Sequence, residues 1–194
     1  MSGVARKARP AHLLLPDVVV PEWLRSSSGD VVLRRPRPED VAALASYVGT
    51  EASWLSAPPG LLADPMGLLG EYGAGWHGAP NRLGLSMVVA DPVTDRLAGM
   101  VHLGRLDDDG GLWVAIGIAP ELRGRRIAQR ALNLVAAWAL SRGGYRQVLL
   151  EIAVDDAIGQ RVAERCGFRA VRRDRVVVKK PTKERHESWI YARP

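Results

Sequence analysis

The second half of the chain alternates apolar runs with helical patterns, and this order limits the folds that it can adopt. An apolar run at 111–119 is followed by a basic turn and a helical pattern at 127–140. A nearly apolar run at 147–154 is followed by a second helical pattern that ends at Cys166. Because parallel strands need a crossover connection, usually a helix, this order predicts an α/β fold in which a mixed sheet carries helices on both faces. Further strands are expected at 31–35, 83–90, 96–105, 168–178 and 187–192, and a further helix at 41–48.

The turn between the first strand and helix of this unit is short, basic and glycine-bearing. It reads Arg123-Gly124-Arg125-Arg126-Ile127-Ala128. The first N–H groups of a helix lack acceptors within the helix, and the helix dipole favours negative charge there, so the turn can hold an anion. The guanidinium groups would add charge-assisted donors for phosphate oxygens. The alternative reading is a solvated basic helix start.

The length of 194 residues, 47% of them hydrophobic, suits one well-buried domain. Residues 1–29 contain three prolines and end in Ser26-Ser27-Ser28-Gly29, so we expect an N-terminal arm or linker there and the folded domain at 30–194. The single cysteine excludes an internal disulfide and is typical of a reducing compartment. No stretch approaches 18 apolar residues. We therefore expect a cytoplasmic protein with no transmembrane helix and no membrane partner.

The turn and its surroundings resemble the GNAT family of acyl-CoA-dependent N-acetyltransferases. Arg123 and Ala128 match the first and last positions of the family's Arg/Gln-x-x-Gly-x-Gly/Ala turn, whereas Arg126 replaces its glycine. Because Arg126 begins a helix, we expect it to need no positive φ. Gly167-Phe168 matches the Gly-Phe that follows the family's next helix. The opening at 32–40 and the lack of a tyrosine late in the 156–166 helix are similar to the ribosomal-protein N-terminal acetyltransferases.

The resemblance implies a GNAT-like, mostly antiparallel sheet of about six to seven strands and a site for acetyl-CoA. The pantetheine arm of the cofactor would lie between the strands at 112–118 and 148–154 and pair with the backbone of Ile116 and Ile118. The turn at 123–128 would hold the pyrophosphate. Asp156 stands where the family has an asparagine that contacts the cofactor, and it could equally be a plain helix cap. No metal ion is expected.

Two residues are candidates for a general base. Glu151 is the one charged residue inside the 147–154 strand, and because an unpaired buried carboxylate is costly, it faces either water or the cleft. His102 has a suitable ordinary pKa, although a structural histidine is the favoured reading. The glutamate that relatives often carry two residues before Gly117 is Ala115 here, and the late-helix tyrosine of some relatives is Ala163. The acid and base could therefore act through water or be absent.

We predict transfer of an acetyl group from acetyl-CoA to a primary amine, in the first place a peptide or protein N-terminal α-amine. An α-amine has a pKa of about 8, against about 10.4 for lysine, so it depends less on a base. The acceptor side would be lined by 49–82, a segment with a helical stretch near 61–76. The alternatives are another acyl-CoA such as succinyl-CoA, a small-molecule amine as acceptor, or a non-catalytic acyl-CoA-binding or nucleic-acid-binding module. A homodimer is left open.

The charge of the chain divides at the basic turn. Residues 1–122 hold 10 basic and 14 acidic side chains, a net charge of −4, and residues 123–194 hold 17 and 7, a net charge of +10. The basic part would attract a polyanion such as coenzyme A, and the acidic part would suit a cationic amine. Nucleic acid is the rival polyanion, which we do not favour as a partner.

Overall fold

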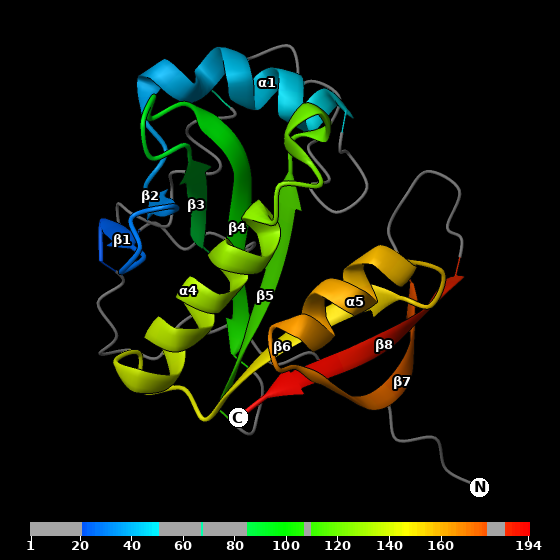
Figure 1. The fold of residues 1–194 in the computed structure, drawn as a ribbon. Coiled ribbons are helices and arrows are strands. Elements are labelled where there is room, and N and C mark those ends of the chain that lie inside the picture. The colour runs from blue at the N-terminus through cyan, green and yellow to red at the C-terminus, as the bar shows by residue number, and fades with distance from the viewer. Residues whose placement is uncertain (1–20, 51–66, 68–84, 107–109, 178–184) are drawn as a thin grey trace, which may run out of the picture.

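The computed structural model describes residues 21–50, 67, 85–106, 110–177 and 185–194, and it shows one eight-stranded sheet with three α-helices among them (Figure 1). The strand order is β1-β2-β3-β4-β5-β6-β8-β7. The strands are β1 (Trp23–Arg25), β2 (Val32–Arg34), β3 (Leu85–Ala90), β4 (Leu97–Leu106), β5 (Gly111–Ile118), β6 (Gln147–Ala153), β7 (Arg169–Val177) and β8 (Arg185–Arg193). The helices are α1 (Val41–Thr50), α4 (Ile127–Ser141) and α5 (Ala157–Arg165).

The α/β class and the mostly antiparallel pairing agree with the prediction, but the sheet has eight strands, not six to seven. Among the described strands, only the β5–β6 pair is parallel. One strand that the sequence did not reveal is β1, which lies inside the supposed arm and pairs with β2. Three residues are too short for a periodic pattern, and Trp23 is 62% exposed, so it is Leu24 that packs on the core.

One face of the sheet packs against α4 and α5. Buried Leu132, Val135 and Ala139 of α4 recur at the spacing of one helix face, and they join Val101 of β4 and Val148 of β6 in the main core. The opposite face of the N-terminal half carries α1, which contributes Leu44 and Tyr47 to a separate cluster with Met100 of β4. Helices therefore lie on both faces, as predicted.

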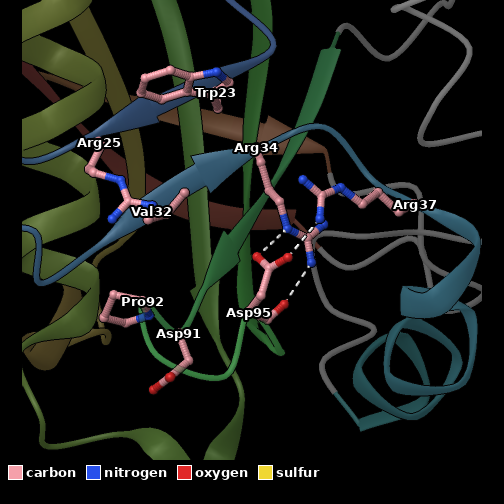
Figure 2. Close-up of a pocket in the computed structure, with 8 residues that line it drawn as sticks. All are labelled: Trp23, Arg25, Val32, Arg34, Arg37, Asp91, Pro92 and Asp95. Atoms are coloured by element: carbon pink, nitrogen blue, oxygen red, sulfur yellow. Dashed lines mark hydrogen bonds and ion pairs between the residues drawn. The ribbon is translucent and has the colours of Figure 1, made fainter.

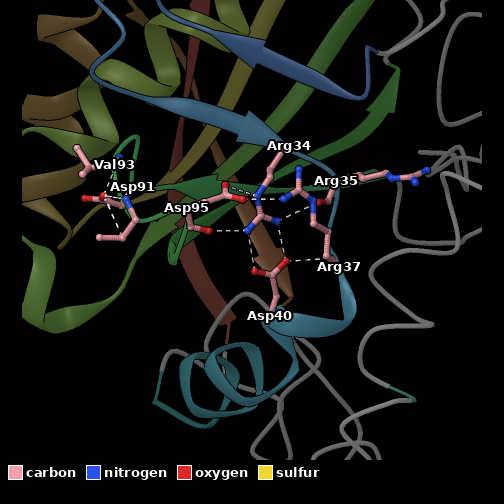
Figure 3. A network of polar contacts seen from close by, with 8 residues as sticks. Arg34, Arg35, Arg37, Asp40, Asp91, Val93 and Asp95 are labelled. Carbon is pink, nitrogen blue, oxygen red and sulfur yellow. Dashed lines mark hydrogen bonds and ion pairs between the residues drawn. The ribbon is translucent and has the colours of Figure 1, made fainter.

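The start of α1 is fixed by a buried arginine whose five N–H groups all have acceptors (Figure 3). The Arg34 guanidinium on β2 donates to both carboxylate oxygens of Asp40 at 2.7 and 2.8 Å, to the carboxylate and the carbonyl of Asp95 at 2.8 Å each, and to the Arg35 carbonyl at 3.1 Å. Arg34 and Asp40 are each 4% exposed. These bonds, with the Asp40 bond foremost, raise the pKa of Arg34 above its ordinary value. The network joins β2, the α1 start and the β3–β4 turn.

Helix α5 begins and ends where the sequence predicts. The carboxylate of Asp156 accepts a hydrogen bond from the Gly159 N–H at 2.8 Å, which is the geometry of an N-cap. Gly167 follows the helix with a φ of +80°, a left-handed conformation that glycine adopts at low cost. Cys166 is buried, as expected of a core residue. In the part of the chain that the structure describes, no helix is long and apolar enough to span a membrane.

Candidate functional site

Strands β5 and β6 pair only at their beginnings. Residues 111–113 of β5 lie opposite 147–149 of β6, and beyond them the ladder between the two strands stops. Figure 1 shows the two halves of the sheet diverging from this point. On their other edges, β6 pairs with β8 along 148–153 and β5 pairs with β4 along 112–118. The edge of β5 from 114 to 118 that faces away from β4 therefore has no ladder partner among the described residues.

The backbone groups on this open edge belong to Ile116 and Ile118. The Ala119 N–H donates to the Ala98 carbonyl at 2.9 Å, so residue 119 faces the β4 side. Because backbone groups alternate along a strand, Gly117 and Ala115 also face β4, and the residues between them face β6. In agreement, a side chain at Gly99 of β4 would collide with the Gly117 carbonyl. The two residues picked out as pantetheine partners thus have backbone groups free of the β4 ladder.

The basic turn follows β5 and leads into α4 through two left-handed residues. Gly124 has a φ of +77°, and a Cβ there would meet nothing within 4 Å. Arg126, the N-cap of α4, has a φ of +59°. The expectation that Arg126 needs no positive φ was wrong, because the cap residue is not yet in the helix and here it adopts the conformation that a glycine would adopt freely.

The guanidinium groups of the turn have different surroundings. Arg123 donates from Nε to the Ile118 carbonyl at 3.1 Å, which holds its side chain against the end of β5. Arg125 and Arg126 are exposed. The pKa of Asp91 is lowered, mainly by the N–H groups of Thr94 and Val93 and in small part by the charge of Arg125, which places that charge near the β3–β4 turn.

The two base candidates lie on one face of the sheet, on the strands that flank β5. His102 on β4 pairs with Ala115 on β5. Because residues two apart on a strand share a face, His102 lies on the same face as Met100, which faces α1. Glu151 lies on the same face of the sheet as Leu149, which pairs with Trp113 and lies outside the main core. Ala115 and Glu151 each come two residues after that pair, where the two strands no longer pair. The small side chain of Ala115 therefore stands between them, at the point where β5 and β6 separate.

His102 is held as a neutral imidazole. Its Nδ1 lies 3.0 Å from the hydroxyl oxygen of Ser86, which pairs with it from β3 and is 1% exposed. Burial lowers the pKa of His102 to about 4, so the ring carries no charge at neutral pH. The contact with Ser86 is what a structural role for His102 predicts. The pairing with Ala115 also places His102 at the candidate site.

Glu151 also has a buried serine partner. The hydroxyl group of Ser188 on β8, 4% exposed, is hydrogen-bonded to the carboxylate. The Glu151 side chain is exposed, but its surroundings desolvate it in part and so raise its pKa; the Ser188 bond opposes this shift, and the charge of Asp174 on β7 adds to it. Neither Ser86 nor Ser188 was identified from the sequence, because only strand register, and not residue type, brings each serine to its partner.

The remaining predicted residues are placed as follows. Asp156 caps α5 through one carboxylate oxygen. Ala163, the position of the absent tyrosine, is buried in the main core. The segment expected to line the acceptor side contains Trp54, Tyr72 and Trp76, which lie outside the described residues, as does the helical stretch near 61–76 apart from Gly67.

A cavity of about 280 Å³ lies elsewhere, between β1, β2 and the β3–β4 turn (Figure 2). Its wall includes Arg34 and Arg37, and both guanidinium groups are engaged by Asp95, Arg37 at 2.6 Å. We read it as part of the network that fixes α1. It contains none of the residues of the open edge, the basic turn or the base candidates.

The comparisons with known proteins agree with this geometry. The acetyltransferase (GNAT) domain family matches residues 30–169, and the chain belongs to this family. No curated protein sequence matches the chain. A GNAT-family acetyltransferase from Bacillus anthracis has a similar fold, with a TM-score of 0.71 at 12% identity over 88% of this chain and 97% of that one.

Two similar structures are acetyltransferases of ribosomal proteins. The ribosomal-protein-S5-alanine acetyltransferase of Vibrio fischeri has a TM-score of 0.67 at 15% identity, over 84% of this chain and 92% of that one. A ribosomal α-N-protein acetyltransferase in complex with coenzyme A has a TM-score of 0.70 at 16% identity, over 88% of this chain and 97% of that one. The chain is thus an N-acetyltransferase of the GNAT family, and ribosomal-protein acetyltransferases share its fold.

Proposed function

We propose that this chain transfers the acetyl group of acetyl-CoA to the N-terminal α-amine of a peptide or protein. The observation that carries the proposal is the open edge of β5, which begins between the two strands that carry the base candidates. The ribosomal-protein acetyltransferases among the similar folds support this choice of acceptor.

The residues around the open edge fit the cofactor. The Ile116 and Ile118 backbone groups would pair with the amides of the pantetheine arm, as a further strand would, although the Ile118 carbonyl also accepts from Arg123 Nε. The turn at 123–128 would meet the pyrophosphate, with the N–H groups at the start of α4 and the exposed guanidiniums of Arg125 and Arg126 as donors. A second oxygen of Asp156 remains for the cofactor while the first caps α5. The bound group supplies the acetyl thioester.

Glu151 would accept the proton that the amine must lose, directly or through a water molecule. Its raised pKa makes it a stronger base than an ordinary carboxylate. His102 stays neutral and so does not repel a cationic acceptor. An N–H group on the open edge would face the thioester oxygen, where negative charge develops.

An α-amine suits these residues better than a lysine side chain. About 10% of an amine of pKa about 8 is neutral at pH 7, against less than about 0.1% at pKa about 10.4. A site that has Ala115 and Ala163 in place of a glutamate and a tyrosine gives less help in removing a proton. An α-amine, with its lower pKa, needs less help to lose this proton.

Mass spectrometry of peptides incubated with acetyl-CoA tests the proposal. We expect acetylation of peptides with a free N-terminus and none of the same peptides with a blocked N-terminus and a free lysine. Modification of the blocked peptides on lysine, or turnover only with small amines, would overturn the choice of acceptor. A panel with succinyl-CoA in place of acetyl-CoA tests the acyl group in the same assay.

A further inference from the structure

Three strands place a serine, a histidine and an alanine in one row. Ser86, His102 and Ala115 are direct partners across β3, β4 and β5. The row ends at the open edge of β5, with Glu151 on the other side of it. Ser86 is enclosed, 1% exposed, at the inner end of the row. The imidazole thus stands between a buried hydroxyl group and the place where the acceptor amine would react.

Small residues surround the outer side of the imidazole. Ala115 faces it on one neighbouring strand, and Gly104, two residues further along β4, has no side chain. A Cβ at Gly104 would lie 4.0 Å from Cδ2 of His102, so this edge of the ring lies beside the space that a side chain at residue 104 would occupy. Cδ2 is bonded to Nε2, which makes no hydrogen bond among the described residues. Nε2 is therefore the ring nitrogen that remains for a ligand.

We propose that Ser86 holds His102 in the tautomer that carries its proton on Nδ1, so that a bare Nε2 accepts a hydrogen bond from the acceptor amine. This inference rests on the proposed function. An amine or ammonium has N–H groups to donate, so its partner must be an acceptor atom. The Ser86 hydroxyl group can donate to Nδ1 or accept from it, and an amine at Nε2 requires the second arrangement, in which the Ser86 oxygen accepts from the Nδ1–H. His102 is then an acceptor-binding residue, and Ser86 is its positioning residue.

Nitrogen NMR of the full chain, labelled at histidine, tests the tautomer without any substrate. The His102 signals are assigned from the spectrum of His102→Asn. We expect a protonated Nδ1 and an unprotonated Nε2 in the wild-type chain, and loss of this preference in Ser86→Ala. A proton on Nε2 in the wild type would overturn the proposal.

Two matched variants test the binding role in the peptide acetylation assay. The His102→Asn amide can bond with Ser86 but has nothing at the Nε2 position, whereas His102→Gln can reach that position but not Ser86. We expect His102→Asn to keep the fold and to raise the KM for the peptide about 10- to 100-fold, as the loss of a hydrogen bond to a charged group does, with the Kd for acetyl-CoA unchanged. His102→Gln should retain part of the peptide affinity.

Ser86→Ala should raise the KM for the peptide by a smaller factor, and Ser86→Thr, which keeps the hydroxyl group, should restore it. An unchanged KM for the peptide in His102→Asn would overturn the proposal even if the enzyme is active. Failure of the wild type to acetylate any peptide would instead overturn the proposed acceptor, and the NMR result would still decide the tautomer.

Discussion

At the scale of single residues, Arg126 adopts a backbone conformation that costs free energy. A left-handed φ costs a side-chain-bearing residue roughly 1 kcal/mol, and no cap hydrogen bond from the Arg126 side chain offsets it. We expect Arg126→Gly to raise the free energy of unfolding by about 0.5–1 kcal/mol, measured in urea, and to change the acetyl-CoA affinity only modestly. Arg125→Gly is the matched control, because Arg125 has no positive φ, and it should not stabilise the fold.

Glu151 is the residue whose charge the proposed reaction needs. We expect Glu151→Gln to lower kcat about 100-fold or more while the acetyl-CoA affinity stays near that of the wild type. Because the carboxylate must be ionised to accept a proton, the wild-type rate should fall as the pH drops through its raised pKa, and this acidic limb should be absent from the variant. An active variant with an unaltered pH–rate profile would make this carboxylate structural.

At the scale of elements, the turn before α4 separates backbone strain from charge. Gly124→Ala and Gly124→Glu both place a side chain at a φ of +77°, where there is space for a Cβ. Only Gly124→Glu adds a negative charge at the proposed pyrophosphate site. Calorimetry should therefore show a severe loss of acetyl-CoA affinity in Gly124→Glu and a smaller loss in Gly124→Ala. Equal affinities of Gly124→Glu and the wild type would remove the turn from the site.

The start of α1 depends on one buried ion pair. Removing one partner of a buried pair leaves the other charge uncompensated and costs about 3–5 kcal/mol. We expect a loss of this size in Arg34→Met, and a smaller loss in the double variant Arg34→Met, Asp40→Leu, both measured by urea unfolding. A single variant as stable as the wild type would mean that the network does not anchor α1.

At the scale of the whole molecule, the sequence predicted the order of the described elements from β2 onward and missed their lateral alignment. The patterns at 111–119, 127–140 and 147–154 each identify one element within a residue or two. The alignment of His102, Ala115 and Glu151 follows from the registers of β4, β5 and β6, which depend on packing across the sheet and not on any local pattern. The left-handed Arg126 was missed because arginine, unlike glycine, gives no signal of positive φ.

The uneven charge of the chain gives a prediction for the molecule as a whole. The basic part of the chain, residues 123–194 with a net charge of +10, begins at the turn proposed to hold the cofactor's phosphates, so its attraction for these phosphates should be screened by salt. We expect the KM for acetyl-CoA to rise steeply between low and physiological ionic strength. Acetyl-pantetheine, a donor with the same thioester and no phosphates, is the control and should show a KM that is almost independent of salt. Equal salt dependence for the two donors would mean that the basic part of the chain does not attract the phosphates of the cofactor.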